Sequence, residues 1–507
     1  MPESFWRSVH ELAEGEGPVL HMPGHGNLSP VSEAWGGQAL PTELMRLDQS
    51  EIGGLDYLHD PQDRLKTAQQ RAARVFGANA TWFLVNGATV GNLAAVWSVA
   101  RPGGRLLLAR RSHQSSHAAA AMAALRTSYL SPLPHAPLDG LFGIDLDELR
   151  AQLEGATDIV GVHVTSPDYY GFRLPLDQIA AICHYHRVPL IVDEAHGGHL
   201  TFVEGEATAL SSGADVVVHS PHKTLGSLTQ SALLHVQGDL VDHDRVSEAL
   251  VLLQSSSPSS LLTMSLDAIV EDLEVNGKRL WRERADWADQ VREHRIDGRP
   301  LFLLQQDLPR GVVATDPCKL VVTQPQWQGS LDRVRRSLLA DFGIRPEFAD
   351  HRTLVFSVVR GTTEAHVHGL ADALLAVLQG QEAAPDDLST VALWPQQPPE
   401  QAWEPRMAMQ APRRTLPLAE AAGQVAARAI TPYPPGVPLV LPGEVISTDA
   451  VRVIRALLAD GGVVRGLVTG VDGDVGAICV HQTPPTAPRQ PTAAEREHDE
   501  TIRTGAL

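Results

Sequence analysis

Short apolar runs of strand length alternate with segments of helical periodicity through the first half of this 507-residue chain. Apolar strands of this kind must be covered on both faces, and repeated strand–helix blocks achieve this by forming a mostly parallel sheet between two layers of helices. The pattern therefore predicts a doubly wound α/β domain. The expected strands are 82–85, 105–109, 159–165, 188–192, 214–219 and 232–236, and the expected helices are 64–76, 91–99, 117–125 and 176–186.

The second half of the chain predicts two smaller units. Helical periodicity over 246–295 leads to an α+β unit with expected strands at 311–314, 320–323 and 353–357 and expected helices at 330–342 and 363–378, and a further helix is expected at 448–460. Prolines indicate a linker, and the charged, Pro-rich end of the chain indicates disorder. The predicted organisation is an N-terminal arm (1–40), a major α/β domain (41–300), a small α+β domain (301–392), a Pro-rich linker (393–412), a C-terminal α+β domain (413–485) and a disordered tail (486–507).

Composition excludes several classes of function. The formal net charge is −19 at pH 7, whereas a surface for nucleic acid or an anionic membrane needs a basic footprint. The three cysteines, Cys183, Cys318 and Cys479, form no CxxC pair, so neither a disulfide framework nor a zinc site is expected. No apolar run approaches the ~20 residues of a membrane span, and the N-terminus lacks an export signal. We therefore expect a cytoplasmic enzyme that binds a small molecule, without nucleic acid, membrane or metal.

Two neighbouring strand ends carry an acid and an amine. Asp193 follows the apolar run 188–192, and Lys223 follows the run 214–219. Because ligands of α/β sheets bind beyond the carboxyl ends of the strands, both side chains should face one crevice. An aspartate against a pyridinium nitrogen, with a lysine able to bind the aldehyde covalently, is the protein half of pyridoxal phosphate (PLP) chemistry. Singly, Asp193 could instead cap a helix and Lys223 could be an exposed loop lysine; their combination favours the cofactor site.

The segment Asn86-Gly87-Ala88-Thr89 lies between a predicted strand and a predicted helix. Backbone N–H groups at a helix N-terminus, together with a hydroxyl group, can hold a phosphate. Ser220 and His222 flank Lys223 and could add further contacts. The alternative is ordinary helix capping, for which Asn and Thr are common. The position of this segment at the first strand–helix crossover favours the phosphate site.

His113 follows the predicted strand 105–109, where an imidazole could stack on a flat aromatic cofactor. A histidine at a strand end is as often a hydrogen-bonded structural residue, so the position alone does not decide its role. The same two interpretations apply to four other histidines: His25, His59, His196 and His199.

Several motifs, in order along the chain, resemble those of the Orn/Lys/Arg decarboxylases of prokaryotes. They are His21-Met22-Pro23-Gly24-His25, Gly54-Leu55-Asp56-Tyr57-Leu58-His59, Phe83-Leu84-Val85-Asn86-Gly87-Ala88-Thr89, Val192-Asp193-Glu194-Ala195-His196-Gly197, Ser220-Pro221-His222-Lys223-Thr224-Leu225, Gln254-Ser255-Ser256-Ser257-Pro258-Ser259 and Pro432-Tyr433-Pro434-Pro435-Gly436. The resemblance runs from about His21 to Gly443. It implies PLP fold type I, the aspartate aminotransferase fold, in the short form without an N-terminal wing domain.

The resemblance also implies an activity and an assembly. The activity is decarboxylation of arginine, lysine or ornithine to agmatine, cadaverine or putrescine and CO2, as in polyamine biosynthesis. The assembly is a homodimer or higher homo-oligomer with active sites at the subunit interface. Three departures from the family pattern, at Gly26, Ser112 and Ser166, bear on substrate choice and efficiency.

By the same resemblance, Lys223 binds the cofactor covalently, Asp193 pairs with the pyridine nitrogen and His113 stacks on the ring. His196 lies beside the cofactor, and these four are the expected catalytic residues. The expected phosphate ligands are Gly87, Ala88, Thr89, Ser220 and His222.

Two questions stay open at this point. The acid that binds a basic substrate side chain could be Glu51, Asp56 or Glu444. The reaction could also be transamination on the same fold, for which Arg345 is the candidate to hold the substrate carboxylate, or the chain could be an inactive binding protein.

Overall fold

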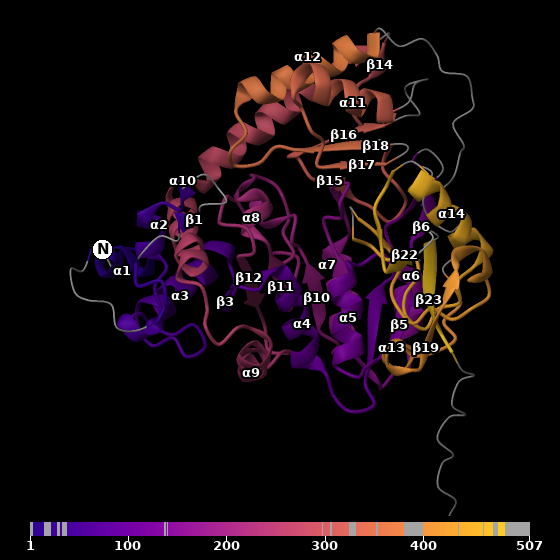
Figure 1. The fold of residues 1–507 in the computed structure, drawn as a ribbon, viewed down its shortest axis with the longest axis horizontal. Helices are drawn as coiled ribbons and strands as arrows, with labels where there is room; N and C mark the ends of the chain where they lie inside the picture. Colours follow the sequence, from indigo (N-terminus) through magenta and orange to yellow (C-terminus); the bar gives the residue numbers. More distant parts are fainter. Residues whose placement is uncertain are drawn as a thin grey trace, which may run out of the picture.

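The computed structural model describes residues 4–14, 22–27, 31–32, 38–135, 138, 140–296, 298–304, 307–323, 331–350, 353–379, 399–433, 436–459, 461–469 and 475–481. Figure 1 shows a central α/β body, a small unit at its top and a C-terminal unit at its side. The predicted arm is described in part, and the predicted tail lies outside the described residues. His21, Pro434 and Pro435 of the family motifs also lie outside them.

A seven-stranded sheet forms the centre of the molecule. Its strand order is β3 (Ala80–Leu84), β12 (Ala232–Val236), β11 (Val216–His219), β10 (Leu190–Asp193), β8 (Ile159–Thr165), β4 (Arg105–Ala109) and β5 (Arg126–Leu130). Strand β12 runs antiparallel to both of its neighbours, and the pairs from β11 to β5 are all parallel. The prediction of a mostly parallel sheet is confirmed, but the periodicity gave no sign that β12 runs the other way.

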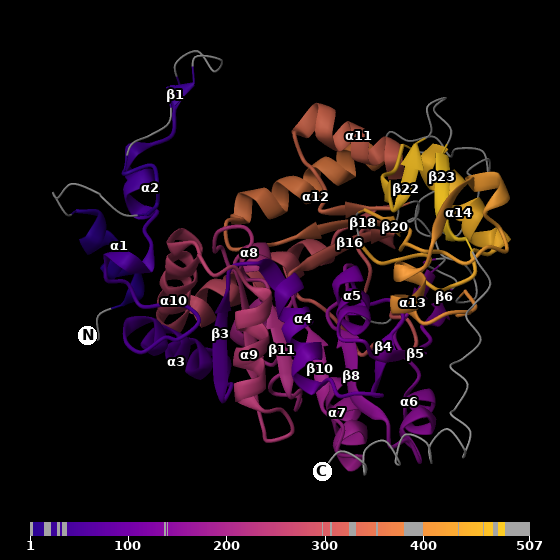
Figure 2. The ribbon, with the colours of Figure 1, turned by 60° about the horizontal axis from the view of Figure 1, so that its bottom comes forward.

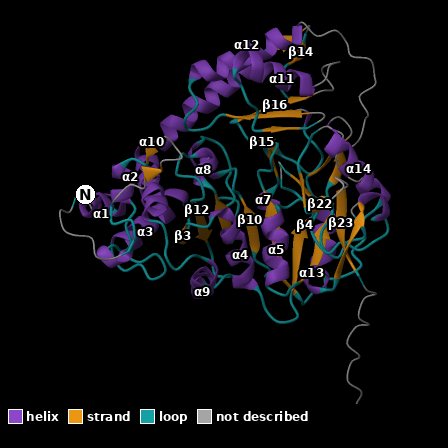
Figure 3. Ribbon diagram, viewed as in Figure 1, coloured by secondary structure: helices purple, strands orange, loops and turns teal. Residues whose placement is uncertain are grey.

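Helices cover both faces of this sheet, as Figure 3 shows. Along β10, Leu190 and Val192 pack into one core and Ile191 into the other, because side chains alternate along a strand. The helices of the first core include α3 (Arg64–Phe76), α6 (Leu146–Leu153), α7 (Leu176–Tyr185) and α10 (Ser260–Arg292), and those of the second are α4 (Gly87–Val99), α5 (Gln114–Met122) and α9 (His243–Leu253).

Two helices begin earlier than predicted. Helix α4 begins at Gly87 rather than 91, and α5 begins at Gln114 rather than 117. Helix α5 begins with the polar residues Gln114, Ser115 and Ser116, and α4 begins with the small residues Gly87, Ala88 and Thr89, so the apolar periodicity of each helix starts later. These early starts place Gly87 in the first turn of α4 and His113 at the N-cap of α5.

The small unit joins the body through the long helix α10. It is an antiparallel sheet of β16 (Lys319–Thr323), β18 (Thr353–Ser357) and β17 (Phe348–Ala349), with α11 (Leu331–Phe342) and α12 (Glu364–Gln379). The predicted strand at 311–314 is wrong except at its last residue: β15 (Ala314–Thr315) pairs with β9 (Phe172–Arg173) of the central body. In Figures 1 and 2 the short helix α8 (Pro221–Thr224) lies directly beneath this unit.

The C-terminal unit is an antiparallel sheet of β19 (Arg413–Pro417), β23 (Val475–Val480) and β22 (Leu467–Thr469), with α14 (Thr448–Ala459) beside it as predicted. The remaining elements are α1 (Phe5–Ala13), β1 (Val31–Ser32), β2 (Gln38–Ala39), α2 (Thr42–Leu47), η2 (Glu51–Gly53), β6 (Leu133–His135), β7 (Gly140–Phe142), η4 (Gly198–Phe202), β13 (Arg295–Ile296), β14 (Arg299–Pro300), α13 (Pro405–Gln410), η7 (Leu418–Glu420), β20 (Thr431–Pro432) and β21 (Val464–Arg465). None of the helices in the described part of the chain combines the length and the hydropathy that a membrane span requires.

Helix α4 lies unusually close to the sheet at Gly91. A Cβ atom at this position would lie 2.7 Å from Val218 Cγ1 and 3.0 Å from Leu84 Cδ1. We expect G91A to lower the free energy of unfolding by ~1–3 kcal/mol, because overpacking forces the helix off the sheet. Denaturant unfolding measures this change.

Gly369 in α12 provides a matched control, since a Cβ atom there would meet nothing within 4 Å. G369A should be neutral or stabilising by up to ~1 kcal/mol, as alanine is the better helix former. Equal stability of G91A and wild type would contradict the close approach of α4.

Candidate active site

The carboxyl ends of β10 and β11 bring Asp193 and Lys223 to one place, as predicted. Asp193 is the last residue of β10 and pairs in register with Val218 of β11. Lys223 follows in α8, one turn beyond the end of β11. Burial lowers the pKa of Lys223, and the nearby carboxylates of Asp193 and Glu347 oppose that effect. The amine therefore lies in a poorly solvated position between two acids.

His196 is the direct neighbour of this amine. Its Nε2 lies 3.1 Å from Lys223 Nζ, and its ring centroid lies 4.7 Å from that of Tyr169. Burial, reinforced by the charges of Lys223 and Lys319, holds the pKa of His196 well below its usual range. The imidazole is therefore neutral and accepts a hydrogen bond from Lys223 Nζ.

Asp193 is buried, and both of its oxygens accept hydrogen bonds. Oδ1 accepts from the backbone N–H of Ala195 at 3.1 Å, and Oδ2 accepts from Asn92 Nδ2 at 2.8 Å. The same Asn92 nitrogen donates to Ser115 Oγ at 3.0 Å, and Ser115 Oγ lies 2.8 Å from His113 Nδ1. A continuous buried network thus joins the end of β10 to the N-cap of α5.

His113 is held from two sides. Its Nδ1 accepts the backbone N–H of Ser115 and so caps α5, and burial is the main cause of its lowered pKa. On the other side, a Cβ atom at Gly436 of the C-terminal unit would lie 3.1 Å from His113 Cδ2 and Nε2. The carbonyl of Gly436 also accepts the backbone N–H of Gln114 at 3.1 Å. The structural and the stacking interpretations of His113 are therefore compatible.

The N-terminus of α4 forms the next part of the site. The alternative that Asn86 caps this helix is wrong, because Asn86 Oδ1 instead accepts the backbone N–H of Ser255 at 3.1 Å. The first backbone N–H groups of α4, at Gly87, Ala88 and Thr89, have no partner within the helix. Gly87 adopts a φ of +76°, which favours glycine. This terminus is suited to an anion.

Ser220 and His222 provide the side chains of this corner. Ser220 is buried, and its Oγ has no hydrogen-bond partner among the residues that the structure describes. His222 uses Nδ1 to contact the carbonyl of Ser231 at 2.7 Å, which leaves Nε2 for a ligand. A buried hydroxyl group without a partner is costly, so an absent acceptor is expected here.

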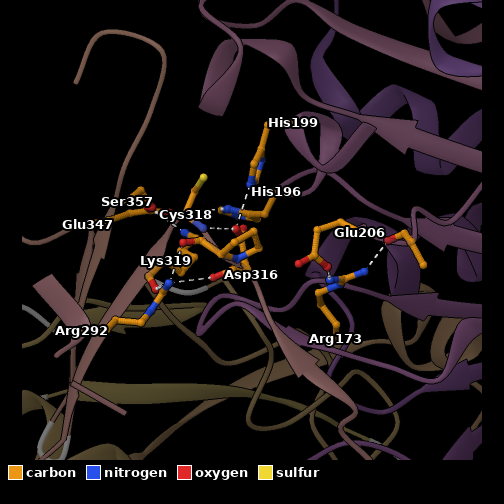
Figure 4. A network of polar contacts seen from close by, with 12 residues as sticks. Arg173, His196, His199, Glu206, Arg292, Asp316, Cys318, Lys319, Glu347 and Ser357 are labelled. Atoms are coloured by element: carbon orange, nitrogen blue, oxygen red, sulfur yellow. Dashed lines mark hydrogen bonds and ion pairs between the residues drawn. The ribbon is translucent and has the colours of Figure 1, made fainter. Parts of the chain in front are cut away.

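A cavity of about 800 Å³ extends from Lys223 along the small unit. Arg345 and Glu347 line it, and Glu347 is the one carboxylate among its described lining residues. Figure 4 shows Glu347 in contact with Lys319 and Ser357. Lys319 Nζ lies 2.8 Å from Glu347 Oε2, and Glu347 Oε1 lies 3.5 Å from His196 Nδ1. Glu347 therefore links a buried lysine of the small unit to the strand end.

The three acids that the sequence offered for binding a basic substrate side chain are not among the described residues that line this cavity. Glu444 cannot serve as a substrate-binding acid, because it is 1% exposed and pairs with Arg110 at 2.8 Å. Asp56 accepts the backbone N–H groups of Gln62, Asp63 and Leu65, and so organises the loop before α3. Glu51 lies in η2, and its role stays a prediction.

Three of the four other histidines, His25, His59 and His199, contact residues other than Lys223. His25 pairs with Asp48, His59 contacts the carbonyl of Ser255, and His199 pairs with Asp316 at 2.8 Å. Ligand atoms of His199, Asp316 and Cys318 lie within 4.8 Å of one another, but His199 Nε2 and Asp316 Oδ1 already bond each other (Figure 4). This cluster is a buried bridge between η4 and the small unit.

Comparison with known proteins agrees with this geometry. The model of the Orn/Lys/Arg decarboxylase major domain matches residues 5–356, and that of the C-terminal domain matches residues 388–473. The chain belongs to the Orn/Lys/Arg decarboxylase family. An arginine decarboxylase of Halalkalibacterium halodurans is 32% identical over 86% of this chain and 89% of its own length, and one of Bacillus subtilis is 30% identical over 88% and 92%. The lysine decarboxylase LdcF of Francisella novicida shares the fold, with a TM-score of 0.77 at 20% identity over 94% of this chain and 81% of its own.

This member of the Orn/Lys/Arg decarboxylase family is a PLP-dependent enzyme that decarboxylates a basic amino acid. The residues present fit that cofactor. The partnerless Ser220 hydroxyl group and the α4 N-terminus suit a phosphate, and a partly buried lysine lies between them and a buried carboxylate. Asn92, Glu347 and Lys319 were not predicted, because a lone Asn in an apolar helix and charged residues far along the chain carry no local signal.

The pair Lys319–Glu347 gives a stability prediction. The Lys319 side chain is 2% exposed and that of Glu347 is 31% exposed. E347Q leaves a buried ammonium without its counter-charge and should lower the free energy of unfolding by ~1–3 kcal/mol. K319M removes the buried charge at similar volume and should cost less.

Urea unfolding of both variants measures the difference. If K319M is as destabilised as E347Q, or more so, the unpaired charge of the buried lysine is not what makes E347Q costly.

Proposed function

We propose that this enzyme converts L-arginine to agmatine and CO2. The supporting observation is the 30–32% identity to two arginine decarboxylases over most of both chains. Glu347 is the one carboxylate among the described residues that line the cavity beside Lys223, and its Oε2 pairs with Lys319. A substrate guanidinium group would share this carboxylate with Lys319.

The proposed roles are those that the family resemblance implies, and the placement of each residue is compatible with them. Lys223 would hold the cofactor covalently, Asp193 would pair with its ring nitrogen and His113 would stack on the ring. The N-terminus of α4 at Gly87, Ala88 and Thr89, with Ser220 and His222, would hold the phosphate. When bound, PLP supplies the electron sink for the electrons that departing CO2 leaves behind.

The chain itself contributes charge, orientation and a proton. Asp193 would supply the counter-charge of the ring nitrogen, and its two accepted hydrogen bonds fix its orientation. Lys223 Nζ donates to the neutral imidazole of His196, and one of these two groups would supply the proton that the product receives. The rings of Tyr169 and His196 shield this amine from water.

We further infer a homodimer in the cytoplasm, with active sites at the subunit interface. Large apolar side chains are exposed on the N-terminal segments: Leu40 (45%), Leu44 (37%) and Ile52 (56%). Exposed apolar groups of this kind favour contact with a second surface. The three cysteines are buried and free, which fits a reducing compartment.

Product analysis tests the proposed reaction. Purified protein with PLP is incubated separately with arginine, lysine and ornithine, and agmatine, cadaverine, putrescine and CO2 are measured. We expect kcat/KM for arginine to exceed the other two values by at least about tenfold, since ~1.4 kcal/mol of differential binding suffices. Faster release of cadaverine or putrescine, or formation of a keto acid, would overturn the assignment.

Two lysine variants serve as matched controls for that assay. K223A should form no measurable amine. K278A, which changes an exposed lysine on α10, should behave as wild type.

A further inference from the structure

Asn92 is a buried polar residue on the inner face of α4 that no motif draws attention to. Its side chain is 1% exposed and contacts three other elements. Nδ2 lies 2.8 Å from Asp193 Oδ2 and 3.0 Å from Ser115 Oγ, and Oδ1 lies 3.4 Å from His163 Nε2. The amide therefore joins β10, α5 and β8 at the centre of the site.

Only one orientation of this amide fits its surroundings. An amide nitrogen carries two hydrogens, and both are used, one by the Asp193 carboxylate and one by Ser115 Oγ. The reverse orientation would place the amide oxygen against the carboxylate. With the observed orientation, Oδ1 accepts from His163, so the proton of His163 lies on Nε2. Burial lowers the pKa of His163 to about 4, and the ring is neutral.

The donor and acceptor roles in this hydrogen-bond network also determine the protonation of His113. Because Ser115 Oγ accepts from Asn92, its own hydrogen is free to point at His113 Nδ1, 2.8 Å away. Nδ1 also accepts the backbone N–H of Ser115 at 3.2 Å. With Nδ1 as an acceptor, the neutral imidazole of His113 carries its proton on Nε2.

We propose that Asn92 is a positioning residue that holds the Asp193 carboxylate toward the cofactor and, through Ser115, fixes the tautomer and orientation of His113. This inference deepens the proposed function and rests on it. The contacts of Asn92 are with Asp193, Ser115 and His163. It would act by aligning Asp193 and His113, the two groups that the proposed function assigns to the cofactor ring.

The N92D variant separates this role from simple packing. Its carboxyl side chain matches that of asparagine in shape but can donate to Asp193 only when it is protonated. Burial and the adjacent carboxylate raise the pKa of such an acid, so the donor is present below that pKa and lost above it. Among the described residues, Lys223, His113, His163 and Tyr169 are titratable groups that interact electrostatically with Asp193.

The experiment compares the holoenzymes of wild type, N92L, N92D, S115A and S98A. The dissociation constant of PLP is measured from cofactor absorbance, kcat/KM for arginine is measured from pH 5.5 to 8.5, and the unfolding midpoint is recorded. Loss of a hydrogen bond to a charged group corresponds to roughly tenfold or more in an equilibrium constant. N92L should therefore bind PLP about tenfold more weakly and be slower at every pH.

N92D should be as impaired as N92L at high pH and recover several-fold toward low pH, relative to the wild-type profile. S115A keeps the Asp193 contact, so its PLP affinity should stay close to wild type while kcat/KM falls. S98A removes a buried hydroxyl group from α4, the helix that carries Asn92. Ser98 Oγ donates to Ala95 O at 2.8 Å, and its loss should change stability only.

Wild-type PLP affinity in N92L, or identical pH profiles for N92D and N92L, would overturn the inference. The N92D and S115A variants keep it testable if N92L does not fold. PLP binding needs no substrate, so a protein that binds PLP as expected but prefers another amino acid would refute only the arginine assignment.

Discussion

The close contact between α4 and the central sheet is the constraint on which the site depends. Gly91 has no side chain, so the helix lies against Val218 of β11 and Leu84 of β3. At this separation the first turn of α4 lies beside the strand ends, and Asn92 reaches Asp193 at 2.8 Å. A methyl group at position 91 would push the helix away from the sheet. The first turn of α4 would then move away from the strand ends, and Asn92 would lose its hydrogen bond to Asp193. The catalytic arrangement is thus a consequence of backbone packing before it is a matter of individual side chains.

The small unit completes the site with charge. Lys319 is buried on β16, where an ammonium group needs a counter-charge. Glu347 supplies that charge and, with its other oxygen, faces His196. The electrostatic environment of Lys223 is therefore set by residues of two units, Asp193 of the central body and Glu347 and Lys319 of the small unit. Movement of the small unit relative to the body would change that environment directly.

The sequence allowed prediction of those site residues that stand next to a recognisable strand or helix pattern. Asp193, Lys223 and Gly87 adjoin apolar runs, and parallel strand ends must meet at one edge of a sheet. Three features escaped prediction for physical reasons. The reversed direction of β12 depends on its pairing partners, the role of Asn92 depends on three elements meeting, and Glu347 arrives from a separate unit. Glu444 was misjudged because a buried acid paired with Arg110 looks the same in sequence as a free one.

The contact between Gly436 and His113 has a further consequence for the architecture of the chain. The C-terminal unit provides the wall against one edge of the imidazole and anchors itself beside the end of β4 through Arg110 and Glu444. A shortened chain that stops after α12 would open this edge to solvent and deprive Arg110 of its anion. The C-terminal unit is therefore a structural part of the candidate site and not an appended module.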